Sequence, residues 1–231
     1  MLPLKDNVPT RSFPLVTVSL IAANTIVWLW ELGNGVDSAV LHDGYYPCSV
    51  DGPCVAPASL LHHLPWYESA FSSMFLHVSW THILGNMLFL WIFGNNVEDA
   101  LGPVRFFLWY IAAGLVAILV QSVVTLAFST AAGASVPNVG ASGAIAGVLG
   151  AYIVLLPNAK VLTFIFFLIR EIPAVWFLGI WFLFQFAEGG FALLHPEQSG
   201  GVAFFAHVGG FLFGALTVRV VARRRPLQPT W

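Results

Sequence analysis

Long apolar runs separated by short polar breaks fill this chain from about residue 14 to residue 222. A membrane-spanning helix needs roughly 20 consecutive, mainly apolar residues. Six runs approach this length, and they are continuous, whereas the strands of a membrane barrel would alternate. The runs cover residues 14–33, 79–97, 104–128, 140–156, 172–192 and 201–222. The pattern predicts an all-α fold, a polytopic membrane protein with six transmembrane helices.

Composition supports a membrane protein. Hydrophobic residues make up 58% of the chain and charged residues only 9%, whereas soluble domains carry about 25% charged residues. We therefore expect one membrane domain over residues 14–222, preceded by a cytoplasmic N-terminal segment, 1–13, and followed by a basic cytoplasmic tail, 223–231. The first span lacks a small-residue cleavage site and is expected to be retained. A formal net charge of -2 gives no reason to expect a nucleic-acid partner.

Basic residues predict the orientation of these spans. With six spans, all nine lysines and arginines fall on the side that the two termini share. The positive-inside rule makes this side cytoplasmic, so the long loop 34–78 lies outside. We expect segment 159–171 to lie along the inner membrane surface and the fifth span to open at Pro173. That span carries many aromatic residues, which would form either a lateral gate or a lipid-packed wall.

Ser142 is the first candidate for chemistry, because Gly140, Ala141 and Gly143 frame its hydroxyl at the start of the fourth span. One interpretation is helix packing, since Gly143 and Gly147 form a small-xxx-small face. The other is a nucleophile. The free backbone N–H groups of a helix N-terminus, including that of Ser142, would favour an oxyanion there, and Gly140 and Gly143 would let a substrate backbone approach closely.

His207 in the sixth span is the candidate base. Ionisable groups inside spans are costly and suggest function, although a histidine bonded to a neighbouring helix is the structural alternative. Gly210 and Gly214 lie on nearly the same helical face as His207 and would bring that face against the fourth span. An imidazole beside Ser142 would accept the serine proton and return it to a leaving amine.

His82 and Asn86 are four residues apart and share one face of the second span. They form either an interhelical hydrogen-bond pair or, beside a serine nucleophile, an oxyanion hole. We expect His77 to brace the outer loop against this span. No acidic residue occupies the middle of a span, which disfavours proton-coupled transport. No metal-binding spacing is present, and we expect no metal and no cofactor.

Together these residues resemble the rhomboid intramembrane serine proteases. The motifs are His77 and His82 followed by Asn86-Met87, Gly94 to Gly102 with Glu98, Gly140-Ala141-Ser142-Gly143, and Ala206-His207 followed by Gly209-Gly210. The resemblance implies a rhomboid-like bundle and a Ser142–His207 dyad, with His82 and Asn86 supporting the oxyanion and Glu98 in a structural role. It also implies cleavage of a substrate helix close to where that helix enters the membrane.

This sequence departs from the family pattern at two places. Many rhomboids carry an aromatic residue four positions after the serine that stacks on the catalytic histidine. Here that position is Ala146, so another side chain must fix the His207 ring. Many also carry a Trp-Arg pair in the first outer loop, where this chain has Trp66 and no arginine. Neither departure removes a catalytic group.

We interpret the chain as a serine endopeptidase that cleaves single-span transmembrane proteins near the outer surface of a lipid bilayer. The basic loop pattern favours a bacterial inner membrane. The alternative is a catalytically silent rhomboid-like protein that binds membrane proteins. Cys48 and Cys54 in the outer loop flank turn-forming residues, and we expect a disulfide between them, because this loop should face an oxidising compartment. The alternative is two unpaired cysteines.

Overall fold

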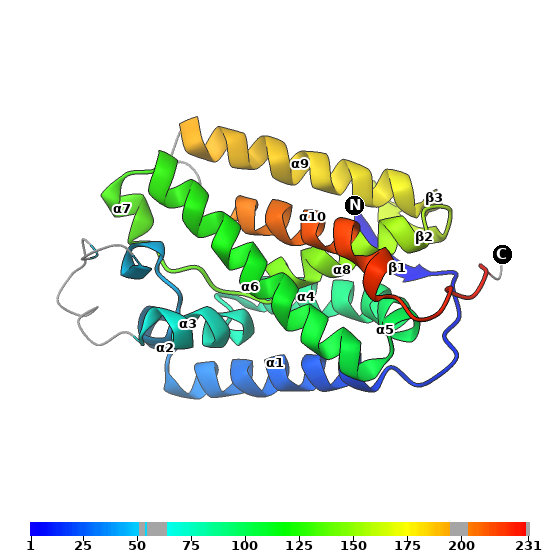
Figure 1. Ribbon diagram of the computed structural model, residues 1–231, viewed down its shortest axis with the longest axis horizontal. Coiled ribbons are helices and arrows are strands. Elements are labelled where there is room, and N and C mark those ends of the chain that lie inside the picture. Colours follow the sequence, from blue (N-terminus) through cyan, green and yellow to red (C-terminus); the bar gives the residue numbers. More distant parts are fainter. Residues whose placement is uncertain (51–53, 55–63, 195–202, 230–231) are drawn as a thin grey trace.

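Six main helices form a bundle in the computed structural model, which describes residues 1–50, 54, 64–194 and 203–229 (Figure 1). Four of them are single helices of 18 or more residues: α1 (Leu15–Asn34), α6 (Pro103–Phe128), α9 (Ala174–Leu194) and α10 (Phe204–Val221). Another is built from α4 (Trp80–Phe89), the π-helical turn η4 (Leu90–Gly94) and α5 (Asn95–Leu101). The remaining one is α8 (Ser142–Leu155).

The predicted polytopic helical bundle is confirmed. Helices α1, α6, α9 and α10 are long and apolar enough to cross a membrane. The α4–α5 segment, bent by 81° from the helical segment Trp66–Phe75 before it, gives a fifth candidate span. Helix α8 has only 14 residues, or about 21 Å at 1.5 Å per residue, against a hydrocarbon core of about 30 Å. One end of α8 therefore lies within the membrane.

Short elements fill the loops at the end of the bundle opposite the C-terminus (Figure 1). Between α1 and α4 the chain forms α2 (Val36–Asp43), η1 (Pro47–Val50), α3 (Trp66–Ser72) and η3 (Ser73–Phe75). Between α6 and α8 it forms α7 (Ala131–Ala134).

A small antiparallel sheet is the main departure from the sequence-based expectation. Strands β1 (Leu2–Asp6), β2 (Lys160–Ile165) and β3 (Leu168–Pro173) pair in the order β1-β2-β3. No strands were expected from the sequence in segment 159–171, and most of this segment forms the β2–β3 hairpin. The β-branched and aromatic residues of this segment favour strands. The prediction for Pro173 was also wrong, since it ends β3 opposite Lys160 and α9 begins at Ala174.

The sheet is tied to the far end of α8 by a buried polar contact. The Tyr152 hydroxyl in α8 donates a hydrogen bond of 2.5 Å to the Asp6 carboxylate in β1. Burial raises the pKa of Asp6 to about 6, because removing water disfavours the charged carboxylate. This contact holds the sheet against the end of α8 that is remote from Ser142.

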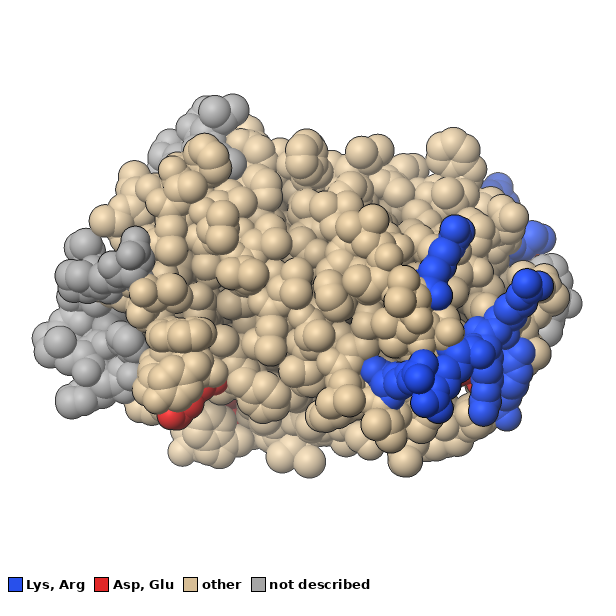
Figure 2. All heavy atoms as spheres, in the orientation of Figure 1, with Lys and Arg blue, Asp and Glu red and all other residues tan. Residues whose placement is uncertain are grey.

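Basic side chains gather at the end of the molecule near this sheet and the C-terminus (Figure 2). Arg11 there donates to the buried Asp99 in α5 at 2.6 Å, and to the Arg225 carbonyl at 2.8 Å. These contacts join the two terminal segments to the same corner of the bundle. The basic side chains are therefore segregated at one end of the molecule, as the count of basic residues per loop predicts.

The side chain of Glu98 in α5 caps the N-terminus of α1. Its buried carboxylate accepts hydrogen bonds from the backbone N–H groups of Val16 and Thr17, at 3.0 and 2.8 Å, and from the Thr17 hydroxyl at 2.8 Å. The first N–H groups of a helix lack partners within the helix, and a negative charge is favourable there. Glu98 thus has a structural position, fixing α1 against the second span.

Helices α8 and α10 approach each other more closely than side chains would allow. A Cβ atom added to Gly210 would clash with the Gly143 carbonyl oxygen, and one added to Gly214 would clash with that of Gly147. Gly150 meets the Phe211 carbonyl in the same way. Such contact between backbones is the usual role of small residues in membrane helices, and it aligns the start of α8 with the start of α10.

We therefore expect Gly210→Ala to destabilise the protein, because its methyl group would force α10 away from α8. The matched control is Gly179→Ala in α9, where nothing lies within 4 Å of the added Cβ. That control should be neutral or stabilising by up to about 1 kcal/mol, since alanine favours helix more than glycine does. Thermal unfolding in detergent measures both. Equal melting temperatures for the two variants would contradict this account of the α8–α10 contact.

In the loop between α1 and α4, Cys48 and Cys54 are joined by a disulfide with a Cα–Cα distance of 5.2 Å, as the sequence analysis predicts. Cys48 packs against Tyr46 and Ala134, so the short covalent loop is fixed to the segment between α6 and α8. Closing such a short loop restricts the unfolded chain only modestly, and the gain should be below the roughly 3 kcal/mol expected for a 15-residue loop.

We expect the same bond in protein isolated from membranes, because a loop outside the cytoplasm meets an oxidising environment. Alkylation without reductant, followed by mass spectrometry, should leave both thiols unmodified. Alkylation after reduction should modify both and serves as the control. Two alkylated thiols in freshly isolated, unreduced membranes would refute the bond and weaken the assignment of this loop to the outer side.

Candidate active site

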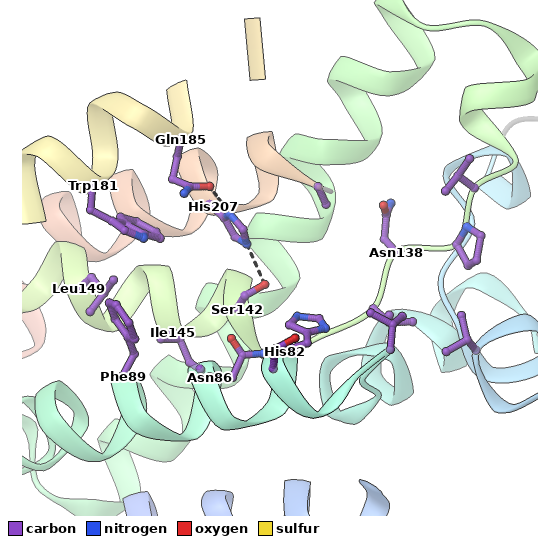
Figure 3. A pocket seen from close by; sticks show the side chains of 18 residues that line it. His82, Asn86, Phe89, Asn138, Ser142, Ile145, Leu149, Trp181, Gln185 and His207 are labelled. Carbon is purple, nitrogen blue, oxygen red and sulfur yellow. Dashed lines mark hydrogen bonds between the residues drawn. The ribbon is translucent and has the colours of Figure 1, made fainter. Parts of the chain in front are cut away.

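The structure brings Ser142 and His207 together. Ser142 is the first residue of α8, and His207 lies in the first turns of α10. Their Oγ and Nε2 atoms are 2.8 Å apart (Figure 3). The residues are separated by 65 positions in sequence, and the glycine contacts of α8 with α10 produce this proximity. The pair has the hydrogen-bond geometry required of a nucleophile and its base.

Gln185 in α9 is a site residue that the sequence analysis did not identify. Its Oε1 atom lies 2.7 Å from Nδ1 of His207, on the side of the ring opposite Ser142 (Figure 3). The side chain is buried, although the neighbouring residues of α9 are apolar. A lone amide within an apolar span was the available signal, because such a group needs a partner when water is absent.

Trp181, one turn before Gln185 on α9, supplies the ring contact that Ala146 cannot. The centroids of the Trp181 indole and the His207 imidazole are 5.9 Å apart, with 41° between the ring planes. Ala146 is completely buried and has no aromatic group to offer. The aromatic neighbour of the histidine therefore comes from α9 and not from the serine helix.

Asn86 and His77 form a polar connection beneath the serine. The Asn86 Nδ2 atom is 3.0 Å from His77 Nε2, and His77 Nδ1 is 3.2 Å from the Phe75 carbonyl oxygen. Because a carbonyl can only accept, Nδ1 carries the hydrogen and Nε2 accepts from the Asn86 amide. The His77 backbone N–H donates to the buried Glu31 carboxylate of α1. His77 thus connects the outer loop to both the first and the second spans.

His82 lies one turn before Asn86 on α4, and both side chains line a cavity that Ser142 and His207 also line (Figure 3). Its ring packs at 5.0 Å from that of His77, and its buried Nδ1 has no protein partner among the described residues. Gly140, with φ +123°, leaves room for the ring, since an added Cβ would lie 2.8 Å from His82 Nε2. Both the positive φ and the close approach require glycine here.

The start of α8 supplies backbone donors. Ser142 opens the helix after Ala141, and the first N–H groups of a helix have no partner within it. Gly143 follows, and its space is taken by Ala117 of α6, 2.7 Å from the position of an added Cβ. The Ser142 N–H therefore belongs to a helix that packs tightly against both α6 and α10, which fixes its position.

These groups open into one cavity of about 690 Å³. Its polar lining residues are Thr81, His82, Asn86, Asn138, Ser142, Gln185 and His207. Most of the remaining lining residues are apolar, from Phe89 and Leu149 within the bundle to Val40 and Pro137 in the outer loops. A largely apolar cavity with a few convergent polar groups is the usual form of a binding site, and this one suits an apolar peptide segment.

Comparison with known proteins is consistent with this arrangement. Residues 65–224 of the 231 match the model of the Rhomboid domain. The chain belongs to the rhomboid family. All the candidate groups just described, from His77 to His207, fall within the matched region.

Similar proteins come from mitochondria and from a bacterium. This rhomboid is 34% identical over 152 residues to Rhomboid protein 1, mitochondrial, of Saccharomyces cerevisiae. The aligned region covers 64% of this chain and 40% of the yeast protein. It is 33% identical over 190 residues to Presenilin-associated rhomboid-like protein A, mitochondrial, of Danio rerio, covering 76% of this chain and 43% of that protein. It is also 32% identical over 157 residues to Rhomboid protease GluP of Bacillus subtilis, covering 68% and 26%. The chain thus spans less than half the length of these relatives.

Proposed function

We propose that this rhomboid is an intramembrane serine endopeptidase that uses a Ser142–His207 dyad. The observation that carries the proposal is the 2.8 Å contact between Ser142 Oγ and His207 Nε2 inside the cavity. The Gln185 carbonyl occupies the other ring nitrogen, so Nε2 is the nitrogen that receives the serine hydrogen. The word protease in the name of the Bacillus relative supports the same reaction.

Acylation follows from these positions. As Ser142 Oγ attacks the scissile carbonyl carbon, His207 Nε2 takes the hydroxyl proton. When the C–N bond breaks, the imidazolium gives this proton to the leaving amine and an ester remains on Ser142. Water then attacks the ester, His207 accepts a proton from the water, and the proton returns to Ser142 Oγ as the acid product leaves.

The negative oxygen formed during each attack needs hydrogen-bond donors. The Ser142 N–H at the start of α8 is one, and its helix end favours negative charge. Asn86 is the second, because it lines the cavity and its amide nitrogen carries a second N–H besides the one donated to His77. His82 is the third candidate, since it lines the same cavity. Gly140 and Gly143 shape the site without donating side-chain groups.

The proposed substrates are single-span transmembrane proteins. A peptide bond within a helix is shielded by its own hydrogen bonds, so the substrate must unwind before Ser142 can reach its carbonyl carbon. Small or helix-breaking residues near the outer membrane surface make this unwinding less costly. The cavity reaches the outer-loop residues Val40 and Pro137, which supports access from that side.

We propose that both termini lie in the cytoplasm. The clustering of basic side chains at the end of the bundle near the C-terminus (Figure 2) supports this orientation. A bacterial inner membrane is the proposed location, and a mitochondrial membrane is the alternative suggested by the names of the yeast and zebrafish relatives.

The dyad is tested by Ser142→Ala and His207→Ala, each of which should abolish cleavage of a model transmembrane substrate in proteoliposomes. The double variant should be no worse than either single variant, because residues that act as a unit are not additive. Ser19→Ala, which removes an exposed serine hydroxyl in α1, should retain full activity. A fluorophosphonate probe should label the parent protein and neither single variant.

Substantial cleavage by Ser142→Ala would eliminate this mechanism. A folded parent protein that neither cleaves nor reacts with the probe would instead support the catalytically silent binding protein as the alternative function.

The oxyanion role is tested by Asn86→Ala, which should lower kcat by about 10²-fold, the usual effect of removing one donor. The substrate KM should change little, because the donor acts mainly in the transition state. Asn34→Ala, which removes an exposed amide at the end of α1, is the control. A raised KM with unchanged kcat would show that Asn86 binds substrate and does not stabilise the oxyanion.

A further inference from the structure

The buried side chain of Gln185 forms a hydrogen bond with the imidazole of His207. Helix α9 is apolar on both sides of it, from Trp181 to Phe186, and its side chain is 9% exposed. Burying an amide in such surroundings is costly unless a partner is present. The partner is His207 Nδ1, at 2.7 Å. The favourable contact is therefore made with the residue that also faces Ser142.

This contact decides which nitrogen of His207 is protonated. In a neutral imidazole one nitrogen donates and the other accepts. The Gln185 carbonyl oxygen can only accept, so it fixes the hydrogen on Nδ1 and leaves the Nε2 lone pair directed at Ser142 Oγ (Figure 3). The other tautomer would present an N–H to the serine and could not take its proton.

A second contact from the same helix limits rotation of the ring. Trp181 and Gln185 are four residues apart and so lie on one face of α9. The Trp181 ring centroid lies 5.9 Å from that of His207. Together the two side chains hold the imidazole at one nitrogen and along one side.

We propose that Gln185 is a positioning residue that completes a serine–histidine–glutamine arrangement, with Trp181 supporting the ring and α9 as the helix that supplies both. The inference rests on the proposed protease function and deepens it. A neutral amide performs the orienting part of the role of a triad carboxylate. It also avoids burying a charge, which would be costly at this depth.

Gln185→Met tests the proposal, since methionine is similar in length, apolar and unable to accept a strong hydrogen bond. We expect kcat to fall by about 10²-fold with KM nearly unchanged, within the range that general acid–base groups contribute. Labelling by the fluorophosphonate probe should slow by a similar factor, because this small reagent needs the serine and its base but no docked substrate helix. Gln185→Ala should behave alike, and agreement between the two separates the missing acceptor from a change in packing.

The conservative replacement gives a readout that a structural role would not produce. Gln185→Glu keeps an acceptor for Nδ1–H, so labelling should recover well above that of Gln185→Met. A carboxylate also stabilises the imidazolium, in which Nε2 can no longer accept the serine proton. The acid limb of the labelling rate should therefore move to higher pH in Gln185→Glu relative to the parent protein.

Phe184→Ala is the matched control, because this side chain on the same helix is 58% exposed and is not among the residues that line the cavity. It should label within about twofold of the parent rate, as expected for a surface change away from the site. The proposal is overturned if Gln185→Met and Gln185→Ala, both folded by thermal unfolding, label and cleave at the parent rate while Ser142→Ala is inactive. Activity in Ser142→Ala would instead overturn the protease function itself.

Discussion

The close contact of α8 with α10 is the constraint on which the rest of the site depends. Gly143 and Gly147 on one helix face Gly210 and Gly214 on the other, with backbone against backbone. This close approach fixes the relative position of the two helices, and within it Ser142 and His207 form a hydrogen bond of 2.8 Å. In lipid, where apolar burial drives helix association only weakly, this packing must supply much of the attraction. The same glycines therefore contribute both to stability and to the geometry of the candidate Ser142–His207 pair.

The short length of α8 has a related consequence. A helix of 14 residues that is anchored at its far end by Tyr152 and the sheet cannot reach the opposite membrane surface. With the sheet at one membrane surface, Ser142 would lie below the other, and the chain before it would run into the membrane in a non-helical form. Such a segment is tolerated only where protein or a cavity satisfies its polar groups. The Gly140 N–H, bonded to the Ser73 carbonyl at 2.8 Å, shows how this is done.

Much of this arrangement could be predicted from the sequence, because hydropathy and glycine spacing are local signals. The six helices lie close to the predicted spans, and the glycine positions predict the α8–α10 contact. The catalytic roles of Ser142, His207, His82 and Asn86 stay predictions. The β hairpin was missed because apolar residues near a membrane surface resemble a short helix as much as a strand. Gln185 was missed because its partner lies 22 residues away on another helix, and no local pattern encodes such a pairing.

Helix α9 connects the shape of the cavity to the state of its base. Its outer face presents Trp176, Phe184 and Phe186, each more than half exposed, whereas Phe182 packs on Phe211 of α10 at 4.5 Å. Ring contacts of this kind tolerate sliding, but a hydrogen bond weakens steeply once its length and angle depart from the optimum. A displacement of α9 that widened the cavity would break the Gln185–His207 bond before it separated the aromatic rings. The orientation of His207 thus depends on how α9 is seated, and under the proposed function this would couple substrate admission to proton transfer.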